Sequence, residues 1–134
     1  MLPSHPEPGW LADVPPRLHE YLSHAVGCQT AAAAGRVAAV LAANGPMDEA
    51  YFEVLRAEGF ALADEGPPAA YERPASFVCG RRDRVAGYRG VYDSLGRFPG
   101  ADYVLAAEAG HFLPVEEPDL FRSAVRSWLG RCST

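Results

Sequence analysis

The chain has no lysine. Its twelve basic residues are all arginines, set against seventeen acidic ones, and the formal net charge is −5. A nucleic-acid-binding surface needs clustered basic residues, so this balance argues against that class of partner. No apolar run approaches the roughly 20 residues that a membrane-spanning helix needs, and no apolar signal segment precedes the rest of the chain. We therefore expect neither a nucleic-acid partner nor a membrane partner.

Cysteine is also scarce. The three cysteines, Cys28, Cys79 and Cys132, are odd in number and lack the spacing of a metal site. Without a signal segment, the simplest expectation is free thiols in a reducing cytoplasm. Cys79 lies within an apolar run, which favours a buried inert thiol over a reactive one. Nothing near Cys28 in the sequence would activate its sulfur.

At 134 residues, 49% of them hydrophobic, the chain can form one domain with a real core. Its composition divides it into residues 1–72, a helical part with a proline-rich and irregular arm over residues 2–16, and residues 73–134. In the first part we expect helices over residues 17–26 and 29–44. A third helix is indicated by the apolar repeat from Met47 to Leu55, with its end at Gly59.

The second part has the pattern strand, helix, strand, helix. We expect strands over residues 75–79 and 102–108, a helix over residues 88–97 between them, and a last helix that begins at Pro118. The acidic residues Glu116, Glu117 and Asp119 would favour the positive end of that last helix. A helical crossover makes the two strands parallel, so the fold class is α/β, with a short parallel sheet and flanking helices.

Parallel strands end at the same edge of a sheet, where α/β proteins build their active sites. Asp83 follows the first predicted strand, and His111 follows the second, 28 positions later. We therefore expect these two side chains to be neighbours. An aspartate that holds a histidine makes up two members of a nucleophilic triad, so Asp83 and His111 are the candidate catalytic residues.

Residues 73–134 resemble the C-terminal portion of the α/β-hydrolase family. The resemblance rests on Gly80-Arg81-Arg82-Asp83, Phe98-Pro99, Gly110-His111 and Glu116-Glu117-Pro118, which occur in the family's order. Residues 1–72 resemble, more weakly, the helical lid that the family inserts before the acid-bearing strand. The resemblance implies that Asp83 orients His111, that a small acyl or ester compound is the substrate, and that no cofactor is needed.

The sequence departs from the family at the nucleophile. No serine, cysteine or aspartate has glycine two residues away on both sides, and the oxyanion loop and earlier strands of the family are missing. Hydrolysis is expected only if a serine and an oxyanion hole come from another chain or from a missing N-terminal part. The alternatives are a non-catalytic pseudo-hydrolase or interaction module, and a truncated portion of an ordinary hydrolase.

Two strands make too small a sheet to stand alone, since one edge and one face of such a sheet would remain open. We therefore expect a homo-oligomer or a complex with a complementary N-terminal half.

Three other sequence patterns support a functional interpretation more weakly. His19 and His24 are five positions apart, so they do not share one helix face, as two histidine ligands of a zinc ion would. The favoured interpretation is that they belong to a solvent-exposed face of the helix. The arginines around Asp83 could steer an anionic substrate, but a solvated loop is the preferred interpretation. Tyr51, Phe52 and Phe60 could line a pocket beneath the lid, although their helical spacing favours core packing.

Overall fold

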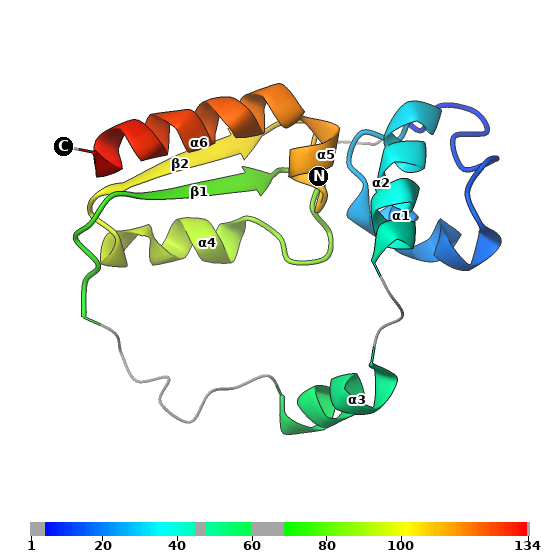
Figure 1. Cartoon of the computed structure of the whole chain (residues 1–134), viewed down its shortest axis with the longest axis horizontal. Helices are drawn as coiled ribbons and strands as arrows, with labels where there is room; N and C mark the ends of the chain where they lie inside the picture. Colours follow the sequence, from blue (N-terminus) through cyan, green and yellow to red (C-terminus); the bar gives the residue numbers. More distant parts are fainter. Residues whose placement is uncertain (1–4, 45–47, 60–68, 134) are drawn as a thin grey trace.

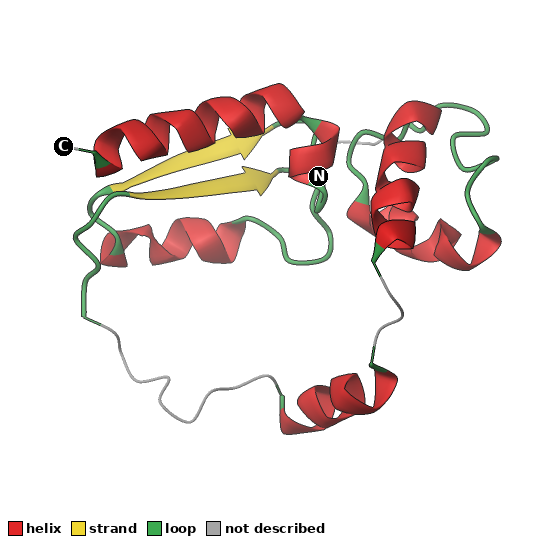
Figure 2. Ribbon diagram, viewed as in Figure 1, coloured by secondary structure: helices red, strands yellow, loops and turns green. Residues whose placement is uncertain are grey.

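The computed structural model describes residues 5–44, 48–59 and 69–133. It has a mixed α/β architecture with helices on both sides of a two-stranded parallel sheet (Figures 1 and 2). The first part contains η1 (Pro16–Leu18), α1 (His19–Ala25), α2 (Ala31–Ala43) and α3 (Glu49–Glu58). The second part contains β1 (Ala75–Gly80), α4 (Arg89–Ser94), η2 (Leu95–Arg97), β2 (Ala101–Ala106), α5 (Leu113–Glu116) and α6 (Pro118–Cys132).

The sheet consists of β1 and β2, which pair in parallel from Ala75 opposite Ala101 to Gly80 opposite Ala106. The crossover through α4 and η2 lies against one face of the sheet, and α6 covers the other (Figure 1). Among the described residues neither strand has a second neighbour. As a result, only the last residue of each strand is fully buried, and the others are half-buried.

Local signals set most of the helix boundaries. Thr30 caps α2 by accepting a hydrogen bond from the Ala33 amide at 3.2 Å, and Asp48 caps α3 by accepting one from the Tyr51 amide at 3.0 Å. The third helix ends before Gly59, as predicted. The final helix begins at Pro118, also as predicted, and continues to Cys132.

Two predicted features of the second part are corrected by the structure. The second strand was expected over residues 102–108, but β2 covers Ala101–Ala106, and the chain then turns, with Glu108 forming an ion pair with Arg82. Glu116 was expected at the positive end of the last helix. It instead belongs to a separate short helix, α5, and its carboxylate is buried.

The buried apolar residues form two clusters. The N-terminal cluster consists of Val14, Leu22, Val26, Ala33, Ala34 and Val37. Trp10 and Leu11 of the irregular arm pack against it, as do Phe112 and Val115 from the second part of the chain. The sheet cluster consists of Ala106, Ala109 and Leu113, with Val78, Leu120 and Phe121 packed around it. Each predicted part therefore has apolar packing of its own, and Phe112 and Val115 link the two.

Helix α3 contributes no buried residue. The Tyr51 side chain is 62% exposed, so the expectation of core packing is wrong for this residue. Its neighbour Phe52 is half-buried beneath the guanidinium of Arg56, 5.0 Å from the ring centroid. The helix lies apart from the sheet and its covering helices (Figure 1), so none of these described elements covers the Tyr51 side chain. Phe60, the third member of that set, lies outside the described residues.

Over residues 5–44, 48–59 and 69–133, no helix has both the length and the apolar character needed to cross a membrane.

Candidate active site

Asp83 and His111 meet at the carboxyl end of the sheet. Asp83 lies three residues after the end of β1, and His111 lies five residues after the end of β2. The Nδ1 atom of His111 is 3.1 Å from Oδ2 of Asp83, which is the distance of a hydrogen bond. The predicted proximity of these two residues is therefore confirmed, and it follows from the parallel pairing of the two strands.

The other carboxylate oxygen of Asp83 fixes the loop that follows β1. Oδ1 accepts hydrogen bonds from the backbone amides of Val85 and Ala86, at 2.8 and 3.0 Å. Burial would raise the pKa of Asp83, but the amides of Ala86 and Val85 together with His111 outweigh burial and lower that pKa below its usual value. Asp83 is therefore held as a carboxylate with one oxygen directed at the imidazole.

His111 is the more accessible member of the pair. Its side chain is 36% exposed, whereas that of Asp83 is 11% exposed. When Nδ1–H donates to a carboxylate, Nε2 of a neutral imidazole is the proton acceptor. Within the described part of the chain, no group is hydrogen-bonded to Nε2 of His111. The arrangement therefore presents an oriented base on an accessible surface.

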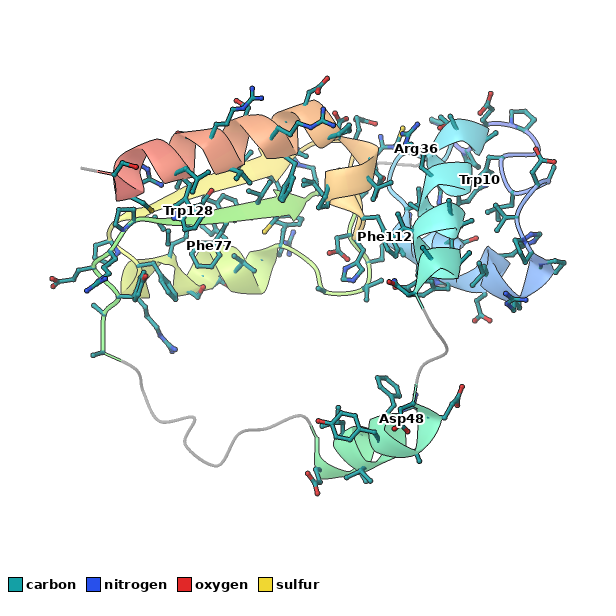
Figure 3. All side chains as sticks on the ribbon, in the orientation of Figure 1. Trp10, Arg36, Asp48, Phe77, Phe112 and Trp128 are labelled. Carbon is teal, nitrogen blue, oxygen red and sulfur yellow. The ribbon has the colours of Figure 1, made fainter. Side chains whose placement is uncertain are left out.

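The backbone of the histidine loop is attached to the N-terminal helices. The amide of His111 donates to the carbonyl oxygen of Ala25, the last residue of α1, at 2.6 Å. Phe112 makes an edge-to-face contact with Tyr21 of α1, with ring centroids 6.1 Å apart. Figure 3 shows Phe112 between the ends of the strands and the N-terminal helices. The first part of the chain thus covers the edge of the sheet at which the pair lies.

Glu116 is the buried carboxylate at this junction. It is 7% exposed, and its Oε2 accepts hydrogen bonds from the amides of Gly27 and Cys28, each at 2.8 Å. Its Oε1 accepts a third from the amide of Gly110, at 3.0 Å. One side chain therefore joins the turn between α1 and α2 to the residue that precedes His111. The sequence places Glu116 in the Glu-Glu-Pro pattern, but nothing in that pattern indicates three backbone partners far apart in the chain.

Two glycines make this junction possible. A Cβ atom at Gly110 would overlap the carbonyl oxygen of Ala25, and one at Gly27 would overlap the backbone of Glu108 and Ala109. The two backbones lie too close together for any side chain at either position. The Gly110 of the Gly-His pattern is therefore required by its contact with α1.

Arg82 adds a further connection across the junction. Its NH1 atom donates to the carbonyl oxygen of Gly27 at 3.2 Å, and its NH2 atom forms an ion pair with Glu108. Arg82 is thus engaged in holding loops together and is only partly exposed.

The other candidates have local roles. His19 Nε2 lies 2.8 Å from the carbonyl oxygen of Val14, and His24 Nδ1 lies 2.9 Å from that of Glu20, so each ring bonds to the backbone. Among the described residues, no group of three or more His, Cys, Asp or Glu side chains is placed to hold a metal ion.

Burial raises the pKa of Cys79, which disfavours its thiolate. Cys28 packs against the N-terminal cluster.

No nucleophile is in place beside His111. The hydroxyls of Ser23, Ser94 and Ser133 donate to carbonyl oxygens within their own helical segments. Across the described ranges, neither a hydroxyl nor a thiol is hydrogen-bonded to the imidazole. The structure therefore brings Asp83 and His111 together, but within the described residues it places no nucleophile beside them.

Comparison with known proteins adds no relative. A scan against models of protein families, a search of curated proteins and a search of solved structures each found no match to this chain.

Proposed function

We propose that this chain is the acid- and histidine-bearing part of an α/β-hydrolase-like enzyme, which hydrolyses an ester or other acyl bond of a small molecule. A second chain, or further N-terminal sequence of the same protein, supplies the serine and the oxyanion hole. The observation that carries this proposal is the hydrogen bond between Asp83 and His111 at the carboxyl end of two parallel strands, with the His111 side chain 36% exposed.

In such a complex each group has a defined task. Nε2 of His111 accepts the proton of the serine hydroxyl as the oxygen attacks the acyl carbon, and then gives that proton to the leaving group. Water repeats the attack on the acyl-enzyme, which releases the acid and restores the serine. Asp83 holds the imidazole in the required tautomer and stabilises the imidazolium. The position of α1 and α2 over this edge of the sheet fits the role of a lid that shapes the substrate site (Figure 1).

The test is to express this chain with the coding sequence upstream of Met1, or with a neighbouring gene that encodes the missing strands. A fluorophosphonate probe and a fluorescent ester then report on the serine and on turnover. We expect labelling and turnover in the complex but not in the isolated chain. His111→Ala should abolish turnover, and Asp83→Asn should lower it by roughly 10⁴-fold, as in other Ser-His-Asp systems.

The matched control is His24→Ala, because His24 is another histidine and its ring is bonded, among the described residues, to a backbone carbonyl oxygen alone. This variant should leave turnover unchanged. Turnover that survives His111→Ala would overturn the proposal. Turnover by the isolated chain that requires both Asp83 and His111 would place the nucleophile within this sequence.

A second function is favoured by the sheet itself. In the described part of the chain, each strand has one neighbour only and is half-buried along most of its length. Such strands are available for pairing with another chain. A non-catalytic module that associates with itself or with a complementary half is therefore the alternative, and sedimentation at low micromolar concentration tests it. A monodisperse monomer with a cooperative melting transition would contradict it.

A further inference from the structure

A hollow lies beside Asp83, on the side of the loop that leads into α4. Its volume is about 540 Å³, and its wall runs from Arg81 to Arg84 and from Ala86 to Gly90. This size is within the range of about 300–1,000 Å³ that is usual for small-molecule sites. Asp83 forms part of the wall, so the hollow adjoins the candidate catalytic pair.

The wall of this hollow is unusually basic for this protein. Of the twelve arginines of a chain with a net charge of −5, four lie between positions 81 and 89, and all four line the hollow. A concentration of positive charge on an acidic protein produces a local attractive potential for anions.

Three of these arginines are free to bind a ligand. Arg82 is engaged by Glu108 and by the carbonyl oxygen of Gly27. By contrast, the exposed guanidinium groups of Arg81, Arg84 and Arg89 form neither an ion pair nor a hydrogen bond within the described residues.

Among the described residues, the nearby acidic groups form no ion pair with these three arginines. Asp83 is bonded to His111 and to two amides, and Glu108 is paired with Arg82. Asp93, one turn along α4 from Arg89, forms no ion pair with it, and Asp93 lines an adjacent hollow instead.

We propose that this hollow is a binding site for a small molecule with a carboxylate or phosphate group, which Arg81, Arg84 and Arg89 hold by charge-assisted hydrogen bonds. The substrate of the Asp83–His111 pair is then an acyl compound with an anionic group at the end away from the scissile bond. The assignment of the ligand as a substrate rests on the proposed hydrolase function, but the binding of the anion does not.

The test uses the unaltered full chain at low ionic strength. Inorganic phosphate, succinate and the neutral succinamide are titrated separately, and binding is followed by two-dimensional amide NMR. We expect saturable shifts confined to residues 81–90 with phosphate, with succinate or with both, and none with succinamide. Phosphate alone would indicate a phosphorylated ligand, and succinate alone would indicate a carboxylate.

The double variant Arg84→Ala/Arg89→Ala should weaken binding at least about tenfold, because the loss of even one charge-assisted bond costs roughly a factor of ten. The matched control is Arg126→Ala, since Arg126 is an exposed arginine on α6 without an ion pair in the described residues. It should leave binding unchanged.

Absence of saturable shifts with either anion would overturn the proposal, and so would equal weakening by the control. His111→Ala should abolish turnover by any complex yet leave anion binding intact. A failure of the anion-binding site can therefore be told apart from a failure of the proposed hydrolase function.

Discussion

Replacing Glu116 tests whether one buried carboxylate holds the histidine loop to the N-terminal helices. Glu116→Ala leaves the amides of Gly27, Cys28 and Gly110 without their acceptor. An unsatisfied buried donor costs about 1–3 kcal/mol. Gly27 and Gly110 are buried, whereas Cys28 is half-buried, so water can replace the bond only at Cys28. We expect a loss of about 3–5 kcal/mol in the free energy of unfolding.

The assay is urea unfolding at a fixed protein concentration, so that any self-association affects all variants alike. With a urea dependence of about 1–3 kcal/mol per molar, the predicted loss lowers the midpoint by about 2 M. Glu116→Gln should have a smaller effect, because its oxygen can still accept from two amides while its NH₂ group faces the third. Glu117→Ala is the matched control, since the Glu117 side chain has no hydrogen bond or ion pair in the described ranges.

A midpoint for Glu116→Ala within about 0.3 M of the unaltered chain would refute the reasoning, because that is the effect of an ordinary surface substitution. An equal loss from Glu117→Ala would also refute it. If Glu116→Ala does not fold at all, Glu116→Gln still provides the comparison with Glu117→Ala.

Two further predictions follow from the same site. Gly110→Ala should lower the thermal unfolding midpoint strongly, because the added Cβ atom would overlap the backbone of Ala25. The control Gly96→Ala should change the midpoint little, because a Cβ atom there meets open space. Equal changes in the two midpoints would contradict this prediction. The pKa of Asp83 is lowered in the folded chain, so its stabilising contribution is present above the usual aspartate pKa and is lost as the pH falls through the folded pKa. In urea unfolding, Asp83→Asn should therefore lower the free energy of unfolding at pH 6, and by less at pH 3. The control Asp119→Asn, at an exposed ion pair, should show little difference between the two pH values. An equal loss from Asp83→Asn at both pH values would contradict the lowered pKa of Asp83.

Much of the local structure could be predicted because its signals are local. Gly59 follows a helix end, and Pro118 suits a first helical turn. The order of strand, helix and strand then made the sheet parallel, and this brought Asp83 and His111 to one edge. The limits of β2 were missed because Ala107 continues the apolar run of the strand, while the turn that contains Glu108 is stabilised by Arg82, a residue distant in the sequence.

Non-local packing accounts for the other errors. Tyr51 lies on an apolar face at helical spacing, and such a pattern indicates burial only when another element is available to cover that face. Glu116 has the sequence context of a helix-terminal acid. Its actual partners lie 6 to 89 positions away, and no short pattern contains them.

The sequence by itself determined the α/β class, the positions of most helices and the proximity of one carboxylate to one imidazole, since these depend on residue periodicity and on the direction of neighbouring strands. Only the tertiary structure decided how the N-terminal helices attach to the histidine loop, which arginines remain unpaired beside Asp83, and that no nucleophile meets His111 within the described residues. The physical reason is that buried hydrogen bonds, close backbone contacts and unpaired charges depend on which distant segments meet, and that is settled by the packing of the whole chain.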